Sequence, residues 1–79
     1  MNVRILFFGM IAEAVKSSQY VIENYQGKTI GELEDYLKNR FPQLHDFTYQ
    51  IALNQTAVGR TAELLPVSEV AFLPPFAGG

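Results

Sequence analysis

Hydrophobic and polar residues alternate in several short segments of the chain, and a period of two is the pattern of β-strands. Residues 3–8 form the first such segment, which is rich in β-branched and aromatic side chains and ends at Gly9. The other segments with this pattern are residues 19–25, 49–53, 56–58 and 69–73. Pro74 and Pro75 end the last segment, because proline cannot donate to a sheet ladder.

Residues 29–41 show a different period, with apolar side chains at helical spacing. The apolar positions are Ile30, Leu33, Leu37 and Phe41. Thr29 and Glu32 have the spacing of a capping box, and Pro42 ends the run. The pattern therefore predicts one amphipathic helix that lies on a sheet.

The remaining segments are assigned to short or solvent-exposed structure. Residues 10–16 contain helix formers but are few, so we expect one or two helical turns there. Residues 42–47 are predicted to be a connection, and His45, the only histidine, is interpreted as a surface residue. Glu34 and Asp35 are expected on the outer, solvent-facing side of the main helix.

The order of these elements is strand, strand, helix, strand, short strand, strand. One main helix can cover one face, so the economical arrangement is a mixed sheet of four to five strands with the helix packed across it. The first and last strands are expected side by side at the centre, and the right-handed crossover rule favours a β-grasp roll. The predicted class is α+β, with a domain over residues 1–73 and a flexible, extended tail over residues 74–79.

The composition limits the classes of partner. Hydrophobic residues make up 48% of the chain and charged residues 18%, so some apolar surface is expected to meet another protein. The net charge is −2 and the basic residues are scattered, which argues against nucleic acid as the main ligand. No apolar run approaches the ~20 residues of a membrane span, and no signal-peptide pattern is present. A cytoplasmic protein without membrane association is therefore expected.

The sequence lacks the usual patterns of catalytic and metal sites. It contains no cysteine, which excludes disulfides, thiolate metal sites and a thiol nucleophile. A single histidine in a loop disfavours a nucleophile and base pair. No glycine-rich phosphate loop and no cluster of metal ligands is found, so no metal site is predicted. The candidate chemistry is therefore placed at the C-terminal carboxylate of Gly79.

The tail has features that suit insertion into another protein. Gly78 and Gly79 have no Cβ, so an extended tail can pass a narrow channel and present its carbonyl carbon unshielded. Two prolines favour a stiff, extended chain, which lowers the ordering cost of insertion. Phe76 is expected to be an anchor that fixes the register. The residues predicted to thread such a channel are Pro74, Pro75, Phe76, Ala77 and Gly78.

These motifs resemble those of a known family, the small, sulfur-carrying subunit of molybdopterin synthase, a MoaD-type member of the ubiquitin-like β-grasp proteins. The resemblance covers the whole chain, and its most specific part is the ending. The matching segments are residues 3–9, 29–42, 51–56 and 69–79. Many family members carry Gly-Asp where this chain has Val67 and Ser68, which is a departure from the family pattern.

The resemblance implies a cycle of activation and sulfur transfer at Gly79. A ubiquitin-activating-like adenylyltransferase would use ATP and magnesium to adenylate this carboxylate. A sulfur donor, such as a cysteine desulfurase or a rhodanese-type protein, would then convert the adenylate to a thiocarboxylate. In the large subunit of the synthase, the sulfur would pass to cyclic pyranopterin monophosphate to form the dithiolene of molybdopterin.

The resemblance also implies a division of labour between subunits. The catalytic residues would lie in the large subunit, so this chain would be a sulfur-donating subunit that is not catalytic alone and holds no permanent cofactor. Two large and two small subunits would form a heterotetramer. On this fold, Leu6, Phe8, Leu73 and Ala57 are predicted to contact the partners. The alternative for this face is cover by a loop of the chain itself.

Three other functions remain open at this point. One is a sulfur carrier for thiamine thiazole synthesis or tRNA thiolation, although Pro74 and Pro75 weigh against the thiazole pathway. The second is a ubiquitin-like modifier that is joined to lysines of other proteins. The third is an interaction module whose terminus has no chemical role. Deletion of Gly79 separates the first two from the third.

Overall fold

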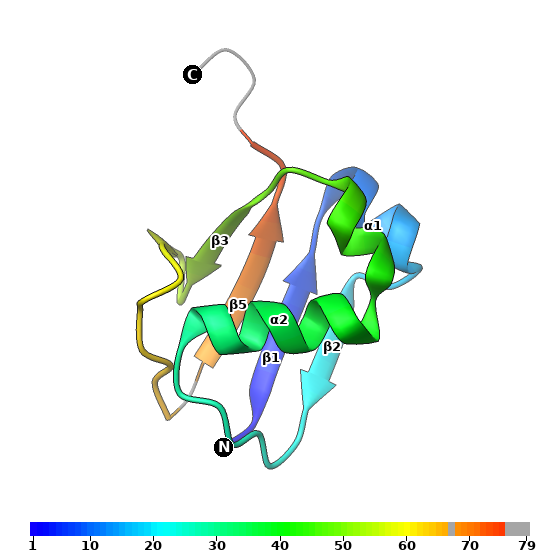
Figure 1. The fold of residues 1–79 in the computed structure, drawn as a ribbon. Helices are drawn as coiled ribbons and strands as arrows, with labels where there is room; N and C mark the ends of the chain where they lie inside the picture. The colour runs from blue at the N-terminus through cyan, green and yellow to red at the C-terminus, as the bar shows by residue number, and fades with distance from the viewer. Residues whose placement is uncertain (67, 76–79) are drawn as a thin grey trace.

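A computed structural model describes residues 1–66 and 68–75 of the chain, and five strands in these ranges form one sheet. The strands are β1 (Val3–Phe7), β2 (Gln19–Ile22), β3 (Gln50–Leu53), β4 (Thr56–Val58) and β5 (Ser68–Leu73). Their order across the sheet is β2-β1-β5-β3-β4 (Figure 1). The central pair β1 and β5 is parallel and all other pairs are antiparallel, so the sheet is mixed as predicted.

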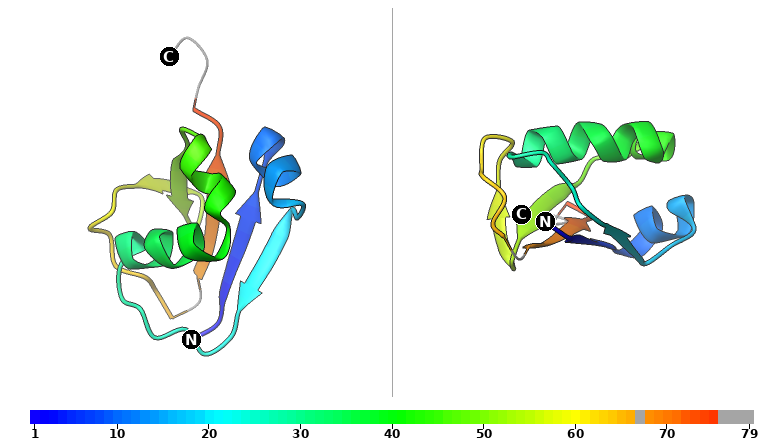
Figure 2. Two further views of the ribbon diagram at one scale, coloured as in Figure 1. Left: turned by 45° about the vertical axis from the view of Figure 1, so that its right-hand side comes forward. Right: turned by 90° about the horizontal axis from the view of Figure 1, so that it is seen from below.

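Two α-helices and one 3₁₀ helix complete the described chain. They are α1 (Gly9–Val15), α2 (Ile30–Arg40) and η1 (Pro42–Asp46). Helix α2 crosses the sheet, and α1 lies on the same side of the sheet as α2 (Figure 2). The opposite face of the sheet, called the outer face below, carries neither of these helices. The predicted α+β arrangement is thus confirmed.

The start of α2 confirms the predicted capping box. The backbone N–H of Glu32 donates to Oγ1 of Thr29 at 3.2 Å, and Oε1 of Glu32 accepts from the backbone N–H of Thr29 at 3.2 Å. The next backbone donors are also used, because Ile30 and Gly31 donate to carbonyl oxygens of the segment that precedes β5. The first turn of α2 is therefore fixed to the rest of the fold.

The core lies between the sheet and the helices, and alternation along the strands decides which residues enter it. Val3, Ile5 and Phe7 of β1 are buried, as are Val70 and Phe72 of β5. These five positions have exposed fractions between 0% and 2%, so one face of each of these strands is turned into the core. The ring of Phe7 lies 5.6 Å from that of Phe72 and 5.5 Å from that of Phe41, at the end of α2.

The clearest differences from the predictions lie at the end of the second strand and in the segment after α2. The second strand ends at Ile22 instead of Tyr25, because Asn24 has a φ of +55°, a left-handed conformation that turns the chain out of the sheet. The predicted connection after α2 contains the helix η1. Asn54 and Gln55 join β3 to β4, and both residues have the positive φ of a two-residue hairpin turn.

Candidate functional site

The outer face carries a row of apolar side chains that runs across four neighbouring strands. In the strand register Leu6 lies opposite Ala71, Ala71 opposite Ala52, and Ala52 opposite Ala57. Ala57 is exposed, Leu6 and Ala71 are partly exposed, and Ala52 is buried between its neighbours. The row is therefore a flat apolar strip on the face that lies opposite α2.

The strip continues toward the end of the sheet from which β5 leaves. Phe7, the last residue of β1, pairs with Phe72 in parallel register. Phe8 follows Phe7 with an extended backbone, so alternation puts Phe8 and Leu73 on the outer face. Phe8 is 43% exposed and Leu73 is partly exposed. The four residues predicted to contact partners, Leu6, Phe8, Leu73 and Ala57, thus lie on one face. We call this set the docking face.

The opposite end of the outer face is polar. Arg4 and Glu69 are paired in the β1 and β5 register and form an ion pair at 3.6 Å, with both side chains partly exposed. The backbone N–H of Glu69 donates to Oδ1 of Asn54 at 2.8 Å, and the N–H of Asn54 donates to the carbonyl oxygen of Glu69 at 2.8 Å. These groups form a polar border to the docking face, which sequence reasoning missed because it depends on strand register.

The tail is described only at its start. Pro74 and Pro75 directly follow β5, and both are exposed. The predictions for Phe76, Ala77, Gly78 and Gly79 lie outside the described residues. The structure therefore places the docking face and the exit of the tail together, at the end of the sheet where Phe8 and Leu73 lie.

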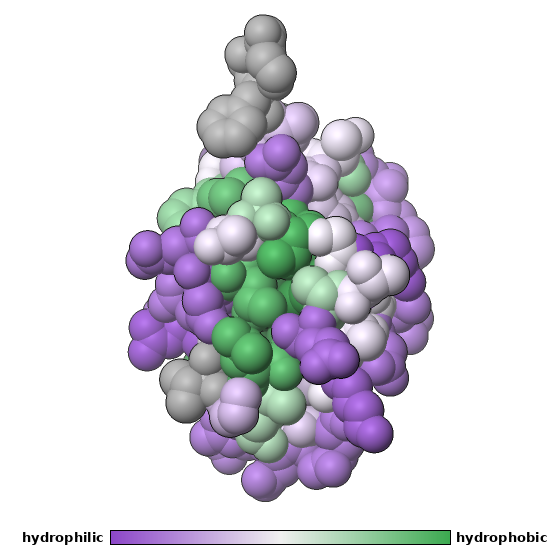
Figure 3. Space-filling view, turned by 90° about the vertical axis from the view of Figure 1, so that its left-hand side faces the viewer, coloured by the Kyte–Doolittle hydropathy of each residue, from purple (hydrophilic) through white to green (hydrophobic). Residues whose placement is uncertain are grey.

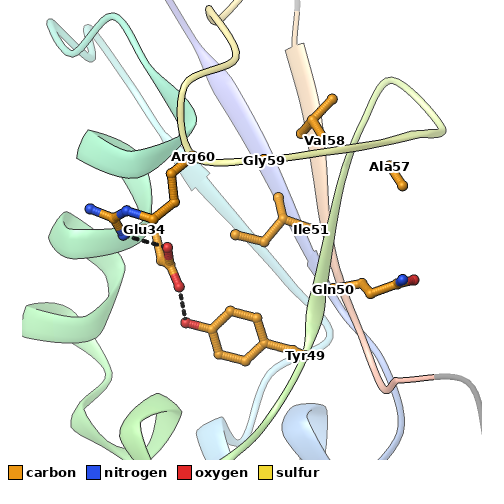
Figure 4. Close-up of a pocket in the computed structure, with 8 residues that line it drawn as sticks. All are labelled: Glu34, Tyr49, Gln50, Ile51, Ala57, Val58, Gly59 and Arg60. Atoms are coloured by element: carbon orange, nitrogen blue, oxygen red, sulfur yellow. Dashed lines mark hydrogen bonds and ion pairs between the residues drawn. The ribbon is translucent and has the colours of Figure 1, made fainter.

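A second polar cluster joins α2 to the sheet edge at β3 and β4 (Figure 4). The Tyr49 hydroxyl donates to Oε2 of Glu34, and Nη1 of Arg60 donates to Oε1 of Glu34 at 2.5 Å. Arg60 also pairs with Asp35 at 3.1 Å, and Nζ of Lys38 lies 3.7 Å from Glu34. We call Glu34, Tyr49 and Arg60 the helix joint.

The predicted place of Glu34 on the solvent-facing side of α2 was wrong, because its exposed fraction is 8%. The helix pattern gave no signal of its partners, which come from distant parts of the chain. Asp35 is exposed, as predicted. The helix joint lines a groove of about 330 Å³ beside β4, together with Ile51 and Val58.

Figure 3 shows this side of the molecule, with hydrophobic residues in the middle and hydrophilic residues on both sides of them. Figure 4 shows that Gln50 and Ala57 point away from the helix joint, whereas Tyr49 points toward it. Ala57 lines the groove and also belongs to the docking face, so the two surfaces meet at this residue.

The pKa shifts of Glu34 and Tyr49 suit a structural role for the helix joint. Burial opposes ionisation of Glu34, but hydrogen bonds from Tyr49 and Arg60 and the charges of Lys38 and Arg60 hold its pKa below its ordinary value of 4.5. Burial raises the pKa of the Tyr49 hydroxyl, and its hydrogen bond to Glu34 adds to this. A carboxylate held ionised and a phenol held neutral suit a lasting contact, since neither is ready to exchange a proton near neutral pH.

Within residues 1–66 and 68–75, no helix is both long enough and apolar enough to cross a membrane. In the same ranges, no group of three or more histidine, aspartate or glutamate side chains is placed to hold a metal ion. The docking face, with Pro74 and Pro75 beside it, is the candidate site of the chain.

Solved structures of other proteins have a fold similar to that of this chain. The fold is similar to that of small archaeal modifier protein 1 from Haloferax volcanii, with a TM-score of 0.81 and 20% identity over 95% of this chain and 98% of that chain. It is also similar to a complex of subunits 1 and 2 of molybdopterin-converting factor from Helicobacter pylori, with a TM-score of 0.72, 26% identity and full coverage of both chains. The β-grasp prediction is thereby confirmed.

The sequence comparisons agree with this fold. The molybdopterin synthase sulfur carrier subunit of Mycobacterium tuberculosis (strain ATCC 25618 / H37Rv) is 35% identical over 81 residues, which cover 99% of this chain and 98% of the relative. The model of the ThiS family matches residues 5–79. The resemblance to MoaD-type proteins is confirmed, and the chain belongs to the ThiS family.

Proposed function

We propose that this chain is the sulfur carrier subunit of molybdopterin synthase. The observation that carries the proposal is that an apolar face opposite α2 ends where β5 leads into the tail, beside Phe8 and Leu73. A partner bound to this face would receive the tail at its edge. The relative from Mycobacterium tuberculosis, similar over nearly the whole of both chains, supports this pathway among those open to the family.

The proposed chemistry takes place at the carboxylate of Gly79. An activating enzyme joins this carboxylate to the α-phosphate of ATP, with magnesium, and pyrophosphate leaves. The terminal sulfur of a donor persulfide then attacks the acyl carbon and AMP leaves, which gives an acyl disulfide. A thiol reduces this disulfide, which releases the thiocarboxylate and leaves the thiol joined to the donor's sulfur as a new disulfide. Adenylation is needed because a carboxylate oxygen is a poor leaving group, whereas AMP is a good one.

In the second stage the thiocarboxylate sulfur attacks a carbon of the cyclic pyranopterin monophosphate held by the large subunit, and a carbon–oxygen bond of that carbon breaks as the carbon–sulfur bond replaces it. Water then releases the sulfur from the acyl carbon and returns the carboxylate at Gly79. Two such cycles supply the two sulfur atoms of the dithiolene. The synthase would be a heterotetramer of two large and two small subunits.

The docking face supplies the contact that guides the tail in this proposal. Phe8 and Leu73 are apolar side chains at the tail exit, and aromatic residues of this kind often dominate interface energies. The polar border at Arg4 and Glu69 would fix the orientation of the partner. The complex of subunits 1 and 2 from Helicobacter pylori supports the large subunit as that partner.

The test is the intact mass of the chain after incubation with the activating enzyme, ATP, magnesium and a sulfur source. We expect the mass increase of one oxygen-to-sulfur exchange, and fragmentation should localise it to Gly79. A variant that lacks Gly79 is the matched control and should show no exchange. An unchanged wild-type mass, with an activating enzyme that is active on another carrier, would refute the proposal.

A second candidate function is a ubiquitin-like modifier, which the similarity to small archaeal modifier protein 1 favours. Adenylation comes first in both functions, so the products must be distinguished. An isopeptide bond between Gly79 and a lysine of another protein would indicate the modifier. A carrier for thiamine thiazole or tRNA thiolation would instead restore those products in a strain that lacks its own carrier.

A further inference from the structure

Strands β1 and β5 reach the same end of the sheet side by side, and there the segments that follow them must separate. Their parallel register pairs Phe7 with Phe72, so continuation by two residues brings Gly9 next to Pro74. The chain turns at Phe8 and Gly9 into α1, while β5 continues out of the sheet (Figure 1). The conformation of this junction therefore decides how much room the start of the tail has.

Gly9 has two properties that suit such a junction. Its φ of +58° is left-handed, a conformation that glycine adopts without steric cost. A Cβ on Gly9 would lie 3.3 Å from Cγ of Pro74, which is tighter than most contacts of a Cβ atom. The Pro74 ring thus rests against the Gly9 backbone at a place where the missing side chain leaves space for it.

We infer that Gly9 is a positioning residue that sets the direction in which the chain leaves the sheet at Pro74. This inference rests on the proposed function, because the direction matters only if the tail enters a partner. The ring of proline fixes its own φ, and Pro75 follows Pro74 directly, so displacement of Pro74 also shifts Pro75 at the start of the tail. Phe8 belongs to the docking face, and Gly9 beside it contacts Pro74. The two adjacent residues therefore have separate roles, since Phe8 binds the partner and Gly9 directs the tail.

The main experiment is Gly9→Ala in the full-length chain, loaded as the thiocarboxylate and mixed with the large subunit. Two quantities are measured separately, the Kd for the large subunit and the single-turnover rate of sulfur transfer at saturating large subunit. We expect the Kd to stay within about twofold, because the docking face is unchanged. The rate should fall about tenfold, because small misplacements of reacting groups are costly.

A double-mutant cycle with Pro74→Ala separates the contact from backbone strain at Gly9. Alanine at position 74 has no Cγ, so it removes the atom that the new Cβ would meet. In the Pro74→Ala background, Gly9→Ala should change the rate by no more than about twofold. An equal loss in both backgrounds would overturn the inference, because strain alone would then explain the effect.

A measurement on the wild-type chain tests the contact without any partner. A nuclear Overhauser effect between the Hα protons of Gly9 and the Hγ protons of Pro74 is expected, and its absence would overturn the inference. If the wild-type chain transfers sulfur and Gly9→Ala transfers it equally fast, Gly9 has no positioning role. If the loaded wild-type chain transfers no sulfur at all, the proposed function fails instead.

Discussion

The two faces of the sheet are built from the same strands and have opposite character. Along β5, Val70 and Phe72 are fully buried beneath α2, whereas Ala71 and Leu73 are only partly covered on the outer face. The inner face is filled with large aliphatic and aromatic side chains, and the outer strip consists mainly of alanines. The difference shows that one face stabilises the domain while the other remains accessible to a partner.

This contrast means that stability and association should be separable by mutation. Residues on the inner face contact each other, so their removal leaves cavities that the fold cannot close. Residues on the outer face make fewer contacts within the chain, and their substitution changes chiefly what the surface presents. The following changes test the contrast in order of decreasing expected effect.

Phe72→Ala on the inner face should have the largest effect. The Phe72 ring lies 5.6 Å from the ring of Phe7 and 5.0 Å from that of Tyr49, so truncation leaves a cavity between them. We expect the free energy of unfolding to fall by about 3–5 kcal/mol, measured by urea denaturation. A loss as small as that of an outer-face substitution would show that the two faces do not differ as described.

Phe8→Asp on the docking face should weaken association and leave the fold intact. We expect the binding free energy for the large subunit to decrease by about 2 kcal/mol, measured by titration calorimetry. The free energy of unfolding should change by no more than about 0.5 kcal/mol. Met10→Asp is the matched control, because Met10 is a 71% exposed hydrophobic residue outside the docking face. Equal binding of wild type and Phe8→Asp would remove the docking face from the proposal.

Tyr49→Phe tests the helix joint, which belongs to the inner side of the sheet. The variant removes the hydroxyl that donates to Glu34 and keeps the ring against Phe72. We expect a loss of about 1–2 kcal/mol in the free energy of unfolding and no change in association. Tyr36→Phe is the control at an exposed tyrosine, and it should be close to neutral. Weaker association of Tyr49→Phe would mean that the groove also contacts the partner.

The pH dependence of stability should show a smaller contribution from the same joint. The pKa of Glu34 lies below 4.5 in the folded chain, so the unfolded chain binds the proton more readily. The stabilisation that ionised Glu34 provides is therefore present above pH 4.5, and it is lost as the pH falls through the lowered pKa of Glu34. Glu34→Gln should reduce the slope of unfolding free energy against pH below 4.5. Parallel slopes for variant and wild type would assign the acid sensitivity to other groups.

The features that sequence predicted well are those encoded by neighbouring residues. The alternation in β1 and β5 and the capping box at Thr29 each depend on a few adjacent positions. The mixed sheet follows from the order of these elements and the single long helix. Leu6 and Phe8 are predicted to contact partners, and both lie on the outer face.

The features that sequence did not predict depend on residues far apart in the chain. The helical pattern places Glu34 on the surface, whereas the fold brings Tyr49 and Arg60 into hydrogen-bond contact with it. The ion pair of Arg4 with Glu69 requires the register of β1 and β5, which the pattern of either strand leaves open. Gly9 ends an apolar segment in the sequence, but its contact with Pro74 exists only because the two strands are parallel.

The position of β5 at the centre of the sheet also has a consequence for folding. It pairs with β1 on one side and β3 on the other, and without it the sheet divides into two antiparallel pairs, β1 with β2 and β3 with β4. Isolated two-stranded units are marginally stable in water. Residue 3 meets residue 68, so the chain must close a long loop before the two halves join, which is a slow step. Proteolysis within β5 should therefore unfold the whole domain. The strand that leads into the tail, β5, is thus also the strand that makes folding cooperative.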